Sequence, residues 1–155
     1  MKVKDLMTKS VITVSKFDSI VSVAKKMKDY DIGFVVVVDD RNEVLGVITD
    51  RDIVLRSVTE NKIDGFVDDI MTPDCVGISK IEDIKKAVEM MGDYQLKRLV
   101  VTDEAKKAIG VLSLSDIARA RNSNKYVNET LYEISIPNPQ KDKPLKYLEV
   151  DDFRL

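Results

Sequence analysis

The chain has 155 residues, of which 44% are hydrophobic and 34% charged, and its net charge at pH 7 is −2. This size and composition are typical of a soluble globular protein with one ordinary domain, or two small domains sharing a core. The small negative charge argues against general nucleic-acid binding, which needs a basic face. The absence of histidine excludes Ser/His/Asp and Cys/His catalysis within the chain.

The targeting features of the sequence favour a cytoplasmic location. The first residues lack the apolar core of a signal peptide. The longest apolar run, around Phe34–Val38, is far shorter than a membrane span. The single cysteine, Cys75, cannot form an internal disulfide, which suits a reducing compartment. We expect a cytoplasmic protein that binds neither membranes nor nucleic acid.

The first third of the chain predicts a strand, a helix, two strands and a second helix. Val11–Val14 is a short apolar strand, and a helix from about residue 18 follows. The strands Phe34–Val38 and Val44–Ile48 are joined by a polar turn over residues 39–43. The first helix has one apolar stripe, formed by Ile20, Val23, Ala24 and Met27.

The second helix begins with a capping pattern that could also bind a ligand. Thr49 and Asp52 have capping-box spacing, and the first turn is expected to offer free backbone N–H groups, with the charge of Arg51 beside them. Such a helix start can hold an anion, and a carboxylate there can accept hydrogen bonds from a ribose diol. Without a ligand, the same residues would only stabilise the helix, by about 1 kcal/mol.

The chain repeats itself at an offset of 64 residues. Val3–Ser57 aligns without gaps on Val67–Arg121, with 17 identities in 55 pairs. Identities spread over every element indicate duplication of a whole folding unit, and two copies predict a closed pair with approximate two-fold symmetry. Each copy is expected to be β-α-β-β-α. The second copy's elements are a strand at 76–78, a helix with the stripe Ile84, Ala87, Val88 and Met91, the strands Leu99–Thr102 and Ala108–Leu112, and a helix capped by Ser113 and Asp116.

The boundaries follow from the repeat. Ser57–Phe66 is polar and contains a glycine, which indicates a linker between domains at 1–60 and 65–122. Asn122–Asn124 indicates a helix stop, and an extension of unknown role occupies residues 123–155. Its apolar segments Leu131–Ile136 and Leu145–Val150, separated by prolines, are expected to pack either on this module or on that of a second copy.

The repeated motifs resemble a pair of CBS domains, the tandem called a Bateman module. The likeness rests on Asp-Leu-Met-Thr at 5–8 and its counterpart at 69–72, on valine runs closed by Asp39 or Asp103, and on Gly-Val-Ile-Thr-Asp-Arg-Asp-Ile at 46–53. It covers about residues 1–121. The resemblance implies an α+β fold in which tandem β-α-β-β-α repeats form a pseudo-two-fold pair, followed by the C-terminal extension.

The resemblance also implies a regulatory function without catalysis. Members of the family bind adenosine-containing ligands (AMP, ADP, ATP, sometimes S-adenosylmethionine) in clefts between the two domains and usually act as regulatory sensors. For this chain, we expect the ligand to favour one relative arrangement of the domains, which a regulated protein detects. No other cofactor is expected, and magnesium would enter only with a nucleotide. The alternative is a structural protein with empty clefts that serves for dimerisation or interaction. An enzyme is not expected, since the sequence has no phosphate-binding loop and no paired carboxylates at a convincing site.

Carried over by position, Asp52 would accept the ribose hydroxyls, and Thr49 and Arg51 would lie by the ribose and phosphates. The positions implied for the first site are Ser10, Val11, Ile12, Gly33, Phe34, Thr49, Asp50, Arg51 and Asp52. Those implied for the second site and its phosphates are Cys75, Val76, Lys97, Arg98, Ser113, Ser115 and Asp116.

Several residues keep more than one interpretation. Lys97 and Arg98 could bind phosphates or simply begin an exposed strand, and the role of Arg56 is undecided. Cys75 is expected to be a small, semi-buried apolar residue. The second site lacks an equivalent of Arg51, so the two clefts are unequal and either could be empty. The helices of both repeats are expected to form an apolar flank, which predicts a homodimer.

Overall fold

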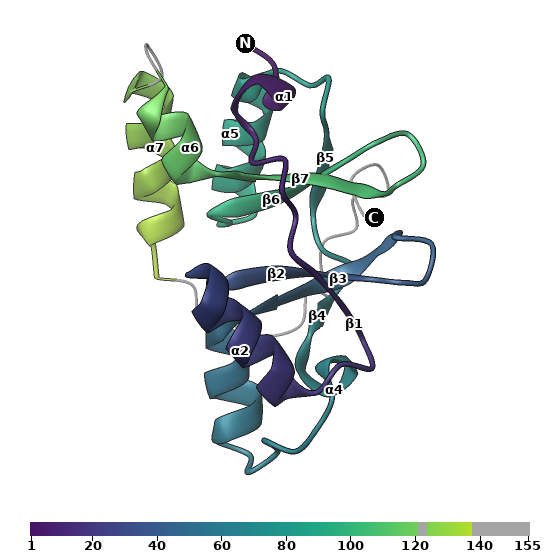
Figure 1. Cartoon of the computed structure of the whole chain (residues 1–155). Coiled ribbons are helices and arrows are strands. Elements are labelled where there is room, and N and C mark those ends of the chain that lie inside the picture. Colours follow the sequence, from purple (N-terminus) through teal and green to yellow (C-terminus); the bar gives the residue numbers. More distant parts are fainter. Residues whose placement is uncertain (121–123, 138–155) are drawn as a thin grey trace.

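The computed structural model describes residues 1–120 and 124–137, and it contains two sheets with helices packed against them (Figure 1). The first repeat contains α1 (Val3–Leu6), β1 (Thr13–Ser15), α2 (Ile20–Tyr30), β2 (Phe34–Val38), β3 (Val44–Thr49), α3 (Asp50–Asp52) and the π-helix η1 (Ile53–Val58). The second contains α4 (Val67–Ile70), β4 (Thr72–Pro73), β5 (Gly77–Ser79), α5 (Ile84–Asp93), β6 (Arg98–Thr102), β7 (Ala108–Ser113) and α6 (Leu114–Arg119), and α7 (Asn124–Ser135) follows.

The predicted elements are confirmed, with shifts at their ends. β2 has the predicted bounds, and β3, β6 and β7 are each one residue longer than predicted. The first helix begins at Ile20 rather than near residue 18, because the Ser19 side chain caps it by accepting a bond from the Ser22 amide. The predicted linker starts too early, because Ser57 is fully buried within η1. At the other end, Phe66 is exposed and forms an isolated bridge with Ser19.

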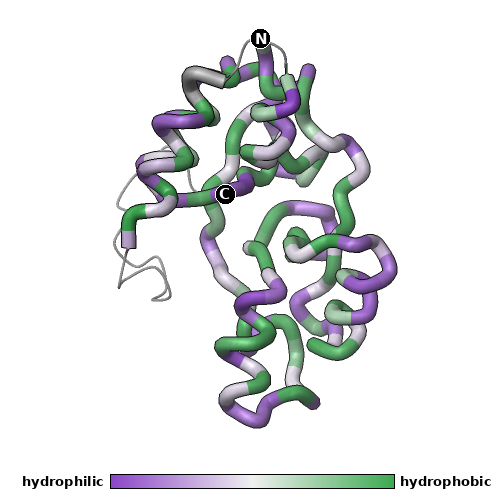
Figure 2. The backbone as a smooth tube through the Cα atoms, turned by 90° about the vertical axis from the view of Figure 1, so that its left-hand side faces the viewer, coloured by the Kyte–Doolittle hydropathy of each residue, from purple (hydrophilic) through white to green (hydrophobic). Residues whose placement is uncertain are grey.

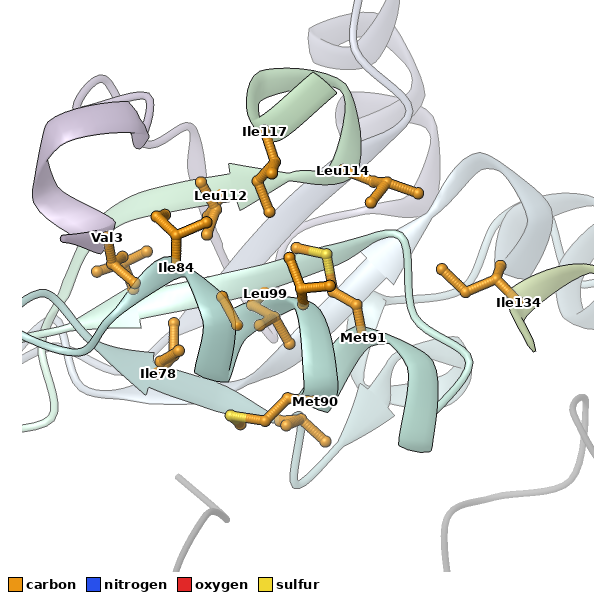
Figure 3. Packing of buried hydrophobic residues seen from close by; sticks show 14 residues of the cluster. Val3, Ile78, Ile84, Met90, Met91, Leu99, Leu112, Leu114, Ile117 and Ile134 are labelled. Carbon is orange, nitrogen blue, oxygen red and sulfur yellow. The ribbon is translucent and has the colours of Figure 1, made fainter. Parts of the chain in front are cut away.

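Each sheet has two buried faces. In β2, Val35 and Val37 point into the core of the first repeat, whereas Val36 points into an apolar cluster between the sheets. In β6, Leu99 and Val101 face the core of the second repeat, which Figure 3 shows closed by residues of α1, α5, α6 and α7. Because both faces of each sheet are buried, the strand sequences are continuous hydrophobic runs and do not alternate between apolar and polar residues.

The two repeats exchange their N-terminal arms, which contain α1 in the first repeat and α4 with β4 in the second. Figure 1 shows α1 beside α5 and β5, while the chain then crosses to β1 and α2 in the other half. Val3 is fully buried in the core of the second repeat, and Val67 is fully buried in that of the first. β4 extends the first sheet by pairing antiparallel with β3. Neither half is therefore complete without a segment from the other.

The two arms make equivalent hydrogen bonds, at positions that differ by the same 64 residues. The Val3 amide donates to the Glu82 carbonyl at 2.9 Å, and 64 residues later the Val67 amide donates to the carbonyl at position 18, also at 2.9 Å. The hairpin turns pair in the same way, since Glu43 and Lys107 form an antiparallel bridge and are equivalent residues. The predicted pseudo-two-fold pair is confirmed, with its axis between these turns.

Gly46 and Gly110 are equivalent residues over which the exchanged arms pass. A Cβ on Gly46 would lie 2.4 Å from the Thr72 carbonyl oxygen. On Gly110 it would lie 2.6 Å from Met7 Sδ and 3.1 Å from the Thr8 carbonyl oxygen. Glycine in these strands is thus explained by the close approach of another segment of the chain.

The first part of the C-terminal extension forms α7, which packs along α5 of its own module. Ile134 is buried in the core of the second repeat, and the Thr130 hydroxyl donates to the Val88 carbonyl at 3.4 Å. The predictions for residues 122–123, Pro139, Pro144 and Leu145–Val150 lie outside the described residues. Within the described ranges, no helix combines the length and apolarity that a membrane span requires.

Candidate functional site

Thr49 and Asp52 form the predicted capping box where β3 passes into α3. The Thr49 amide and hydroxyl donate to Asp52 Oδ2 at 2.9 and 2.8 Å, and the Asp52 amide donates to Thr49 Oγ1 at 3.1 Å. Only 8% of the Asp52 surface is exposed. The carboxylate is therefore held in one orientation, with Oδ2 already accepting two bonds.

The N–H groups of this helix start are already bonded, so the prediction that they are free for an anion is wrong. The Asp50 amide donates to the Gly33 carbonyl at 3.2 Å, and the Arg51 amide donates to Asp50 Oδ1 at 2.8 Å. The Asp52 amide is bonded to Thr49. Short polar side chains favour a helix start because they satisfy these donors. A phosphate here would depend on cationic side chains.

Other positions implied for the first site surround this junction. Phe34 pairs with Thr49 across β2 and β3. The Asp50 side chain lies over Gly33, where an added Cβ would be 2.5 Å from Asp50 Oδ2. The Ile12 carbonyl accepts a bond from β2 at 3.3 Å. The fold therefore brings residues from three separate segments together.

Three further positions of the first site differ in their exposure. Val11 packs beside Phe34 in the apolar cluster between the sheets. Ser10 and Arg51 are exposed. The site thus has an apolar inner wall and a polar outer edge.

Arg56 connects the helix of the first site to the arm from the second repeat. Its Nη1 atom lies 3.3 Å from Asp52 Oδ1. The same atom donates to the carbonyls of Ile70 at 2.9 Å and Met71 at 3.3 Å, and to Thr72 Oγ1 at 3.1 Å. The i, i+4 spacing from Asp52 is visible in the sequence. The arm contacts were missed because they depend on the exchange.

The second repeat contains an equivalent capping box. The Ser113 amide and hydroxyl donate to Asp116 Oδ2 at 2.9 and 2.6 Å, and the Asp116 amide donates to Ser113 Oγ at 3.1 Å. The Arg119 guanidinium bonds to Asp116 Oδ1. The amide after Ser113 donates to the Lys97 carbonyl at 2.9 Å, and Ser115 is exposed on the first turn of α6. These residues of the second site are therefore also brought together.

Arg98 reaches from the second repeat to the first site. Its guanidinium carbon lies 5.9 Å from the centre of the Phe34 ring, and these residues are equivalent in the two repeats. A cation over an aromatic ring is attracted by the ring quadrupole. Arg98 and Lys97 are exposed, so the first site has a cationic edge contributed by its neighbour.

Cys75 and Val76 lie at the buried entrance to β5. Cys75 belongs to the cluster between the sheets, and Val76 to the core of the second repeat. Burial raises the pKa of the Cys75 thiol from 9.0 to about 12, a backbone hydrogen bond lowers it in part, and the negative charge of Asp74 raises it further. The prediction of a small apolar residue is confirmed. Within the part of the chain that the structure describes, no cluster of three acidic or cysteine side chains is placed to bind a metal ion.

Comparison with known proteins accounts for both repeats. The model of the CBS domain family matches residues 3–58 and 67–123. The uncharacterized protein YlbB of Bacillus subtilis (strain 168) is 34% identical over 136 residues, which cover 86% of this chain and 91% of YlbB. The CBS domain-containing protein YhcV of the same organism is 33% identical over 138 residues, which cover 88% of this chain and 96% of YhcV.

A solved structure supports the same assignment. The CBS domain pair of protein MJ0100, in complex with 5′-methylthioadenosine and S-adenosyl-L-methionine, superposes with a TM-score of 0.71 and 27% identity. The match covers 77% of this chain and 94% of that one. The two family matches, the internal symmetry and this superposition agree, and the chain therefore belongs to the CBS domain family as a tandem pair.

Proposed function

We propose that this CBS pair is a regulatory module that binds an adenosine-containing ligand (AMP, ADP, ATP or S-adenosylmethionine) beside Thr49 and Asp52. Binding favours one relative arrangement of the repeats, which a regulated protein detects. The likeness to the MJ0100 pair, which was solved with two adenosine derivatives, supports this class of ligand. Magnesium enters only with a nucleotide, and the protein acts in the cytoplasm.

The buried carboxylate of Asp52 is the observation on which the proposal rests. A buried charge is costly unless hydrogen bonds satisfy it. Thr49 donates twice to Oδ2, and Arg56 pairs with Oδ1. A carboxylate has about four acceptor positions, so Oδ1 retains capacity for a ribose hydroxyl. The rigid capping box would present that oxygen in a fixed direction.

The remaining first-site residues would contact the other parts of the ligand. The adenine would lie against Phe34 and Gly33, with the backbone near Ile12 as its hydrogen-bonding partner. Arg51, together with Lys97 and Arg98 from the second repeat, would attract phosphates. In the second site, Ser113, Ser115 and Asp116 would hold the ribose, with backbone groups of Cys75 and Val76 near the base.

Isothermal titration calorimetry tests the proposal with AMP, ADP, ATP and S-adenosylmethionine in turn. Asp52→Asn keeps the side-chain volume but removes the charge, and a charged hydrogen bond contributes about 1.5–3 kcal/mol. We expect affinity at the first site to fall by about tenfold or more. Asp116→Asn is the matched variant for the second site, and circular dichroism checks that each variant is folded.

Two results would contradict the proposal. One is the absence of binding heat for all four ligands at millimolar concentration with folded wild-type protein. The other is unchanged affinity for every ligand that binds wild type, in both Asp52→Asn and Asp116→Asn, which would move the binding site elsewhere.

A second candidate function is dimerisation or interaction with empty clefts, and an apolar groove between α2 and η1 offers a surface for it. The groove has a volume of about 290 Å³ and is lined by Ile20, Val21, Ala24, Lys25, Lys28, Ile53, Ser57, Val58 and Ile63. Val21, Val58 and Ile63 are between 39% and 48% exposed. Such a patch indicates a protein contact, and we propose a homodimer through this flank under either function.

A further inference from the structure

Arg56 offers one nitrogen atom to more acceptors than it can satisfy. Four oxygens lie within 3.3 Å of Nη1: Asp52 Oδ1, the carbonyls of Ile70 and Met71, and Thr72 Oγ1. That nitrogen carries only two N–H bonds. Its hydrogens are donated to the three oxygens of the exchanged arm, and the same atom forms an ion pair with the carboxylate of the first site. A ligand that changes the charge or the hydrogen bonding of the carboxylate therefore changes the electrostatic pull on the atom that holds the arm.

The arm that Arg56 holds connects the two repeats. Val67 and Ile70 are buried in the core of the first repeat. β4 then pairs with β3, and the chain continues into the second sheet. Any change in how tightly this segment is held would alter the join between the repeats.

Within residues 1–120 and 124–137, the second repeat shows no counterpart of this connection. Alanine stands at position 120, which is equivalent to Arg56, and its methyl group cannot reach a carbonyl of the opposite arm. Asp116 is paired instead with Arg119, which is three residues along α6 and 73% exposed at its side chain. Among the described residues, only the first of the two otherwise symmetric capping boxes is thus linked to an arm by an arginine.

We infer that Arg56 transmits occupancy of the first site to the exchanged arm 68–73. This inference rests on the proposed function, because it requires a ribose hydroxyl to bind Asp52. A hydroxyl that donates to Oδ1 competes with the ion pair between Arg56 and the carboxylate. The guanidinium is then drawn less strongly toward Asp52, its existing hydrogen bonds to the carbonyls of Ile70 and Met71 strengthen, and the arm is held more tightly. The second site, which lacks this arginine, has no such effect on the arm 4–9.

Hydrogen–deuterium exchange of the full chain, with and without saturating AMP, measures this transmission. In wild type, we expect the amides of residues 68–72 (Pro73 has no N–H) to exchange about fivefold more slowly with AMP, the lower end of the usual range of coupling between sites. The equivalent arm at residues 4–9 serves as the internal control and should not change. S-adenosylmethionine replaces AMP if calorimetry shows that it is the ligand that binds.

Variants separate transmission from simple stabilisation. Arg56→Ala is compared at an AMP concentration that saturates it, as measured by calorimetry. The slowing of exchange at 68–73 on adding AMP should disappear, whatever the absolute exchange rate of the variant. Arg56→Lys should retain part of the effect, since an ammonium can donate to the arm but lacks the planar fork of Arg. Arg119→Ala, the matched control in the second repeat, should preserve the full effect.

The outcomes distinguish the inference from the function on which it rests. If AMP binds to wild type and residues 68–73 exchange at an unchanged rate, the transmission is refuted and the binding function stands. The transmission is equally refuted if Arg56→Ala retains the full effect. If none of AMP, ADP, ATP and S-adenosylmethionine binds to wild type, both are overturned. The wild-type comparison remains decisive even if Arg56→Ala fails to fold.

Discussion

The Cys75 thiol illustrates how burial alone determines the chemistry of a single residue. Its neighbours in the apolar cluster include Val36, Val47 and Val100, contributed by both sheets. Such surroundings disfavour the thiolate, which is the reactive form of cysteine. Cys75 therefore acts as a small apolar contact between the repeats.

The raised pKa predicts that Cys75 is inert in the folded protein. With a pKa of about 12, roughly one thiol in ten thousand is ionised at pH 8, and burial blocks access as well. We expect no modification by iodoacetamide at pH 8 in native buffer, followed by complete modification in denaturant. Intact-mass spectrometry measures both. Rapid labelling of the native protein would show that the cluster between the sheets opens readily.

At the scale of elements, the exchanged arms explain why each repeat has a glycine in its last strand. The arms run across β3 and β7 at a distance that leaves no room for a methyl group. The two crossings differ, however. Gly46 faces backbone atoms of the arm, whereas the atom nearest to Gly110 is Sδ of a methionine side chain.

This difference predicts unequal effects of adding a methyl group. Gly46→Ala should lower the free energy of unfolding by about 1–3 kcal/mol, because the arm's backbone must move to relieve the overlap. Gly110→Ala should cost less, since the flexible methionine can take another rotamer. Urea denaturation followed by circular dichroism measures both. Equal costs, or a larger cost at Gly110, would contradict the proposed difference between the crossings.

At the scale of the whole molecule, the longer helices α2, α5 and α7 gather with α6 on one flank (Figure 1). Figure 2 looks onto this flank and shows hydrophobic and hydrophilic stretches alternating along the chain. In the second repeat, α7 packs along α5 and is itself followed by exposed apolar residues such as Ile136. In the first repeat, the groove between α2 and η1 has no helix of the described residues laid over it. The exposed apolar surface thus extends over both repeats.

Burial of this flank predicts a dimer that a charge would disrupt. Sedimentation velocity at micromolar concentration should show a homodimer for wild type. Val58→Glu, at the groove, should shift it to a monomer, because the carboxylate would have to be desolvated at the interface. Ile81→Glu is the control, since Ile81 is also exposed but lies in the loop between β5 and α5. A monomeric wild type, or dissociation by Ile81→Glu alone, would exclude this interface.

The sequence alone determined the elements, their duplication and the two capping boxes. These features depend on contacts between residues close together in the chain. Strand Phe34–Val38 is apolar throughout, and Thr49 caps a helix with Asp52 only three residues away. The 64-residue offset also predicted the pseudo-two-fold pair, because equal sequences fold into equal units that can pack on each other.

Only the tertiary structure decided which segments complete each half. The sequence around Val3 and Val67 fits an arm that packs on its own repeat as well as one that packs on the other repeat. The hydrophobic pattern therefore does not distinguish these two arrangements. The contacts of Arg56 with the arm, and of Arg98 with Phe34, join residues that become neighbours only once the repeats have exchanged arms and faced each other. Long-range contacts of this kind depend on chain topology, which local propensity does not encode.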